Sequence, residues 1–170
     1  MLGVKTFSIL NKLPYFNIIS ALVGDSLHCV DQGATEHLAE LWFCSSNSKK
    51  GWYIGKPPKI IQIDAVLLFA RPPSNLTRLY CSFAQRSYWK GSDWRNWMFY
   101  YGPLALRDIL PDRYYSNFLL YSEAIYTLKK KTKFCEVLES IEQLEKCVED
   151  FERLYGIMNM TFNTNTNCCI

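Results

Sequence analysis

Two short segments hold the residues whose types and spacing could do chemistry. The first is Asp25-Ser26-Leu27-His28, an acidic residue with a histidine three positions later. Mg²⁺ prefers one or two carboxylates together with phosphate oxygens, so Asp25 at the end of a strand could bind a divalent metal, with His28 contacting a phosphate or holding the carboxylate in place. The alternative, which the pattern favours, is a helix start at which Asp25 caps unpaired backbone N–H groups and His28 packs in the first turn.

The second segment, Trp89–Trp97, combines three tryptophans with two cations and one carboxylate. Aromatic stacking beside cations is one way in which proteins hold unpaired nucleotides. The alternative, which this pattern favours, is a helix start with an amphipathic tryptophan face, where Asp93 lies near the positive end of the helix dipole. The candidate nucleic-acid-binding residues of this segment are Trp89, Lys90, Trp94 and Arg95.

A short basic run adds four lysines to these candidates. It could contact phosphate or act as a weak nuclear-localisation patch. Short charge runs are, however, more often solvated connections between elements. Acidic residues and histidines at helical spacing, such as His28 with Asp31, define no third ligand, so a zinc site is not expected. The lysines of the run are Lys129, Lys130, Lys131 and Lys133.

Composition limits the classes to which the chain can belong. Its 170 residues are 49% hydrophobic, 15% aromatic and 21% charged, with a formal net charge of +3. These values are those of a globular protein of one domain, or one domain with an appendage, and they exclude wholesale disorder. The 7 cysteines form no CxxC pair, and no signal peptide or membrane-length apolar run occurs. Reduced thiols in an intracellular protein are therefore expected.

Hydrophobic periodicity predicts a mainly α chain with one or two short strands near its start. Gly or Pro marks the end of four of the expected helices, and an irregular tail follows Gly156. We expect a strand over Asn17–Val23, a loop over Ser45–Gly51, and helices over 25–42, 57–70, 94–101, 104–110, 112–128 and 137–155.

Five segments follow one another in an order more specific than any of them alone. They are Leu13-Pro14-Tyr15-Phe16, Asp25-Ser26-Leu27-His28, WKGSDWR (89–95), FYYGPL (99–104) and FERLYGIMNMTFN (151–163). The first two resemble the LPYF and DxxH passages of CACTA/EnSpm-like DNA transposases from animal genomes. The others resemble the WKxxEWR segment of that family, its continuation, and its LYG…MTYN segment. The resemblance covers roughly residues 13–163.

The resemblance implies an RNase H-like catalytic domain interrupted by a helical insertion. Such enzymes use three acidic residues to hold two divalent ions, normally Mg²⁺, which activate the nucleophile and stabilise the displacement at phosphorus. By the motif match, Asp25 is the second acid, a metal ligand only in an intact triad, and His28 is its companion. Residues 1–44 would then be a core fragment of strand plus helix, 45–156 the helical insertion, and 157–170 an irregular tail.

The departures from the family predict a truncated protein that cannot cleave DNA alone. Only 24 residues precede Asp25, too few for the strands that carry the first acid, and the chain reaches Ile170 before the histidine pair and the third acid. We therefore expect no cofactor of its own, no membrane or small-molecule partner, and a nuclear location. The alternative is a retained helical module that binds DNA or protein, with a second copy or a full-length transposase as partner.

Overall fold

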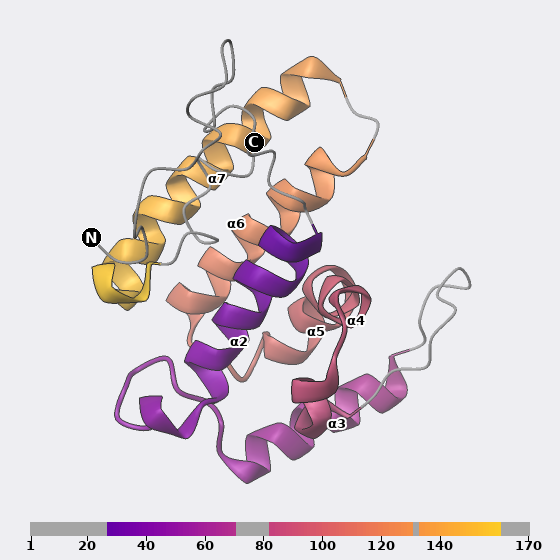
Figure 1. The fold of residues 1–170 in the computed structure, drawn as a ribbon, viewed down its shortest axis with the longest axis vertical. Coiled ribbons are helices and arrows are strands. Elements are labelled where there is room, and N and C mark those ends of the chain that lie inside the picture. The colour runs from indigo at the N-terminus through magenta and orange to yellow at the C-terminus, as the bar shows by residue number, and fades with distance from the viewer. Residues whose placement is uncertain (1–26, 71–81, 131–132, 161–170) are drawn as a thin grey trace, which may run out of the picture.

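The computed structural model describes residues 27–70, 82–130 and 133–160, and this part of the chain is helical, with no β-strand (Figure 1). The predicted mainly α fold is confirmed, whereas the strand expected over Asn17–Val23 lies outside the described residues. The α-helices are α2 (Thr35–Phe43), α3 (Pro57–Phe69), α4 (Gly91–Asn96), α5 (Gly102–Leu106), α6 (Asp112–Leu128) and α7 (Phe134–Tyr155). Two π-helical segments, η2 (Leu27–Ala34) and η5 (Trp97–Tyr101), lead into α2 and α5. The 3₁₀ segments are η3 (Ser45–Asn47), η4 (Phe83–Tyr88) and η6 (Ile157–Asn159).

Helices α6 and α7 lie side by side and make the most extensive contact between elements (Figure 1). On α7 the buried positions step by three or four residues, which places them on one face. Asn117 of α6 crosses the interface and donates from Nδ2 to the carbonyl oxygen of Cys147 at 2.9 Å. The helix ends where predicted, because Gly156 takes φ +84°, which an L side chain rarely adopts. The buried residues of α7 are Ser140, Leu144, Cys147, Phe151 and Tyr155.

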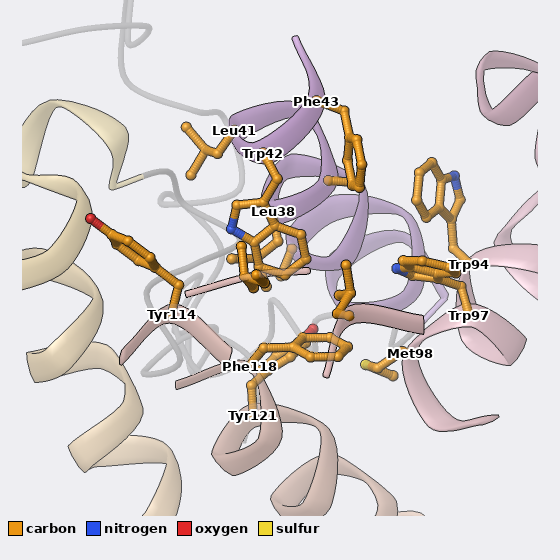
Figure 2. Packing of buried hydrophobic residues seen from close by; sticks show 14 of the residues in the cluster. Leu38, Leu41, Trp42, Phe43, Trp94, Trp97, Met98, Tyr114, Phe118 and Tyr121 are labelled. Carbon is orange, nitrogen blue, oxygen red and sulfur yellow. The ribbon is translucent and has the colours of Figure 1, made fainter. Parts of the chain in front are cut away.

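The η2–α2 segment packs its predicted apolar face against α6. Figure 2 shows Leu38 and Trp42 pointing toward Phe118 and Tyr121, and the Trp42 and Phe118 rings meet edge to face with centroids 5.4 Å apart. Aromatic pairs in this geometry contribute about 0.5–1.5 kcal/mol beyond the burial of their area. The predicted helix face is confirmed by the buried side chains of Val30, Ala34, Leu38, Leu41 and Trp42.

One hydrophobic core joins both sides of the expected domain boundary at 44–45. Trp42 donates from Nε1 to the hydroxyl oxygen of Tyr155 at 2.8 Å, and the Phe43 ring lies 4.4 Å from that of Phe83. Both contacts connect α2 to segments that the resemblance assigns to the helical insertion. Among the described residues, the part before residue 44 and the part after it therefore pack as one unit.

The stretch from 91 to 106 is more continuous than predicted. Helix α4 begins at Gly91, and Asp93 lies inside its first turn, where its Oδ2 accepts a hydrogen bond from the Lys90 backbone N–H at 2.9 Å. The stop expected at Gly102-Pro103 is wrong, because η5 passes directly into α5 there. Proline is tolerated in a first helical turn, and a Cβ on Gly102 would come within 3.0 Å of the Phe118 ring.

Helices α3 and α6 begin as predicted, at Pro57 and Asp112. The helix expected over 104–110 is shorter and earlier, since α5 ends at Leu106 and a turn leads to the buried Leu110. Within the described ranges, the structure contains no helix whose length and apolar character would let it cross a bilayer.

Candidate functional site

The carboxylate of Asp31 is fully buried and is held by two cations. Arg95 donates to Oδ2 through Nε at 2.7 Å and Nη2 at 2.6 Å, and Lys129 Nζ donates to Oδ1 at 2.8 Å. The side chain of Asp31 has 0% exposure, while those of Arg95 and Lys129 are 42% and 25% exposed. A buried carboxylate requires such partners, because an uncompensated charge in the core is strongly destabilising. We call these three residues the Asp31 clamp.

Three elements far apart in the sequence build the clamp. Asp31 lies in η2, Arg95 in α4, and Lys129 directly follows the last residue of α6. A cation is favoured at that position because the carbonyl end of a helix carries partial negative charge. The pairs are separated by 64 and 98 positions, so the clamp connects the start of the described chain to its middle and to the end of α6.

Beside the clamp, hydroxyl groups from α2 and α6 donate to carbonyls of both π-helical segments. The Val30 carbonyl oxygen accepts from Thr35 Oγ1 at 3.0 Å and from the Tyr121 hydroxyl at 3.2 Å. In η5, the Met98 carbonyl oxygen accepts from Ser122 Oγ at 2.8 Å. A π-helical turn interrupts the regular ladder of backbone hydrogen bonds, so side-chain donors at these carbonyls stabilise both segments against α6.

A second polar group joins α2 to the end of α7. His37 Nε2 lies 2.9 Å from the Asn159 carbonyl oxygen, and Asn159 Nδ2 donates to the Tyr155 carbonyl oxygen at 2.6 Å. Burial raises the pKa of the Tyr155 phenol, although its hydrogen bond from Trp42 acts in the opposite direction. The contact of His37 with the Asn159 carbonyl oxygen stabilises the packing of α2 against the end of α7.

The structure places the candidate tryptophans in the core. Trp89 and Trp94 are 7% and 1% exposed, and their ring centroids lie 4.8 Å apart. Phe83 packs against Trp89 at 5.3 Å and against Trp97 at 4.6 Å. Because both candidate indoles are buried, neither can stack on a nucleic-acid base. The arrangement is a helix start with a buried tryptophan face, which the sequence pattern favoured over base stacking. We call Phe83, Trp89, Trp94 and Trp97 the indole cluster.

The candidate cations are used in different ways. Arg95 and Lys129 meet on Asp31, whereas Lys130 Nζ lies 3.8 Å from the centroid of the Tyr126 ring. Lys90 and Lys133 are exposed. The remaining candidate, Lys131, lies outside the described residues.

The metal-site prediction lies largely outside the described residues. Asp25 precedes them, and for His28 the structure describes the backbone in η2 but not the side chain. Among the described side chains, no group of three His, Cys, Asp or Glu residues lies together as a metal site requires.

Sequence reasoning missed the Asp31 clamp, although a signal was present. Asp31, Thr35 and Trp42 lie on the apolar face of the first helix, where a charged residue needs a buried partner. That signal identifies Asp31 as unusual. It does not identify Arg95 or Lys129 as its partners.

Unpaired cations gather at the opposite end of α6, where it begins. Lys59 Nζ donates to the Ile109 carbonyl oxygen at 3.0 Å, and the Arg113 guanidinium lies over the Tyr114 ring at 4.7 Å and against Gly51. Lys50 Nζ lies 5.6 Å from the ring of Trp52, which itself contacts Tyr114. Segments 49–59 and 107–113 meet through these contacts, and we call them the basic end. Their cations are Lys49, Lys50, Lys56, Lys59, Arg107 and Arg113.

Comparison with protein-family models, with curated proteins and with solved structures found no match to this chain. The resemblance to CACTA/EnSpm-like transposases therefore depends on the sequence motifs alone.

Proposed function

We propose that this chain is a helical module derived from a CACTA/EnSpm-like DNA transposase, which binds DNA through its phosphates and does not cleave DNA by itself. The observation that carries the DNA-binding part is the basic end. Two segments, 49–59 and 107–113, contribute its six cations and only two carboxylates, Asp108 and Asp112. Within the described residues none of these cations forms an ion pair. Clustered unpaired cations are the electrostatic pattern that attracts a phosphate backbone.

The charge of α7 is opposite in sign to that of the basic end. This helix carries seven acidic residues and two basic ones. A DNA duplex would be repelled by the acidic side chains of α7 and attracted to the cations of the basic end.

Residues of the transposase-like motifs contribute to the fold in a way that agrees with a retained module. Arg95 of the WKGSDWR segment bonds to Asp31, and Tyr155 of the LYG segment accepts a hydrogen bond from Trp42. Both contacts hold helices together in the interior. A module kept for binding needs this packing, whether or not the surrounding catalytic domain is present.

The proposed lack of cleavage follows from the number of acids that the resemblance identifies. A two-metal site needs several carboxylates, and the motif match supplies Asp25 alone. The purified 170-residue chain is expected to leave supercoiled plasmid DNA intact in Mg²⁺. Nicking that disappears in an Asp25→Ala variant would contradict this part of the proposal.

DNA binding is tested by the salt dependence of duplex affinity, measured by fluorescence anisotropy. If about six phosphates are contacted, affinity falls roughly 1,000-fold between about 50 and 200 mM salt. A Lys49→Glu, Lys50→Glu, Arg113→Glu variant is expected to lose at least about tenfold in affinity at low salt. Lys146→Glu, an exposed charge reversal on α7, is the matched control. Equal losses in both variants would contradict a binding surface at the basic end.

A second candidate function, protein interaction, is favoured by the surface of α3. Ile61, Leu68 and Phe69 are exposed on this helix, whereas Ile63 and Leu67 are its buried residues. A second copy or a full-length transposase would be the partner. Light scattering that shows a monomer at all concentrations would argue against self-association through this helix.

A further inference from the structure

A pocket of about 350 Å³ opens between the η5–α5 segment and α6. Three of its lining residues are aromatic and one is acidic. Its volume lies at the lower end of the range of ligand pockets, roughly 300–1,000 Å³. The residues that line it are Phe99, Tyr100, Pro103, Leu119, Ser122, Glu123 and Tyr126.

The aromatic rings of the pocket are steeply inclined to one another. The Phe99 and Tyr126 centroids lie 5.3 Å apart with planes at 60°, and those of Phe99 and Tyr100 lie 6.3 Å apart at 75°. Lys130 Nζ lies over the Tyr126 ring, so a flat ligand would stack on this ring as the ammonium group moves from the ring to the ligand's phosphate. Tyr126 is 38% exposed, so its ring can be reached from solvent.

Two lysines at the end of α6 flank these rings. Lys129 Nζ lies 5.7 Å from the Phe99 centroid, and Lys130 Nζ lies 3.8 Å from the Tyr126 centroid. A methylated ammonium group, the usual ligand of aromatic cages, would meet the positive charge of Lys130 at close range, whereas the charge of Lys129 is already paired with Asp31. An uncharged aromatic ring that carries a phosphate is instead favoured, because the ring can stack and the lysine can contact the anion.

We infer that this pocket holds one unpaired base of a single nucleic-acid strand, with Lys130 at the adjoining phosphate. The inference rests on the proposed function in taking nucleic acid as the partner, but it uses a different surface. A paired base cannot enter, because stacking in a duplex covers both of its faces. Glu123 adds a preference for a base with an exocyclic amino group, since a carboxylate accepts a hydrogen bond from cytosine N4. Thymine lacks the exocyclic amino group and offers only its N3–H.

The test measures the binding of labelled oligo-dC, oligo-dT and mixed-sequence duplex to the full chain at low salt. Wild type is expected to prefer oligo-dC to oligo-dT. Tyr126→Ala is expected to lose about tenfold in oligo-dC affinity, the effect of removing one base–aromatic stack, with duplex affinity unchanged. Glu123→Gln is expected to reduce the dC preference and leave oligo-dT binding as it is.

Tyr88→Ala is the matched control, since this tyrosine is exposed and lies outside the pocket. Circular dichroism verifies that each variant is folded. An unchanged oligo-dC affinity in Tyr126→Ala, equal losses for oligo-dC and duplex, or competition by a trimethyl-lysine peptide would overturn the inference. Duplex binding that depends on the basic end would survive any of these results. Conversely, if the protein binds oligo-dC in a way that requires Tyr126 but does not bind duplex DNA, the proposed function would be refuted and the inference about the pocket supported.

Discussion

Two groups of aromatic residues lie close together in the sequence and have opposite surroundings. In the indole cluster, Trp94 and Trp97 face the interior, whereas Phe99 and Tyr100 line an open pocket a few positions later. Successive helical residues are rotated about 100° from one another, so a shift of two or three positions changes which side of the chain is presented. Aromatic content by itself therefore does not reveal which rings a ligand can reach.

The Asp31 clamp lies between these two groups and connects them. Arg95 is next to Trp94 in the chain, and Lys129 lies beside the Phe99 ring. Both cations meet on one buried carboxylate. The clamp thus fixes the position of the indole cluster relative to the end of α6, where the pocket opens.

The largest contrast is expected from truncating one ring in each group. Trp97 is fully buried, so Trp97→Ala should lower the free energy of unfolding by about 3–5 kcal/mol, through lost burial and the cavity that remains. Tyr126→Ala in the pocket should lower it by less than about 1 kcal/mol. Urea denaturation followed by circular dichroism measures both. Similar values for the two variants would remove the distinction between a structural and an accessible group.

The next largest effect is expected from opening the clamp. Arg95→Ala leaves Lys129 as the only ionic partner of Asp31 among the described residues, so the free energy of unfolding should fall by about 3 kcal/mol, the lower end for a broken buried ion pair. Adding Asp31→Asn removes the buried charge and should restore part of that loss, as a double-mutant cycle would measure. The control is Arg153→Ala, whose exposed pair with Asp150 should contribute less than about 0.5 kcal/mol. If adding Asp31→Asn restored none of the loss, the clamp would not be ionic.

A smaller loss of unfolding free energy, confined to alkaline pH, is expected from the titration of buried groups. Burial raises the pKa of the Cys147 thiol to about 12, with Asp150 adding to the shift and the Asn117 hydrogen bond opposing it. Because the unfolded thiol titrates near 9, this contribution to stability is complete below that pH and is lost as pH rises above it. The loss should approach about 1.4 kcal/mol per pH unit.

Urea denaturation at pH 8, 9 and 10 measures this slope. Tyr155, whose pKa is also raised by burial, should add to the decline only above about pH 10, where an unfolded phenol titrates. Cys147→Ala should therefore be less stable than wild type at pH 8 but nearly independent of pH up to about 10. A wild-type slope retained in that variant would assign the decline to other groups.

The accuracy of the sequence analysis differed from element to element for physical reasons. The end of α7 at Gly156 and the start of α3 at Pro57 were predicted correctly, because glycine and proline act through local backbone geometry. The expected stop at Gly102-Pro103 failed, because the same residues also permit a first helical turn. The small size of Gly102, which allows Phe118 to approach, is a tertiary requirement.

Local periodicity was enough to determine that the described part of the chain is helical and which face of its first helix is apolar, since the residues involved lie within a few turns of one another. Only the tertiary structure decided what the charged and aromatic side chains do. The partners of Asp31 lie 64 and 98 positions away, and no local pattern selects Arg95 and Lys129 from the 19 basic residues. Packing made that selection, because a carboxylate buried in the core is stable only where cations from other elements can reach it.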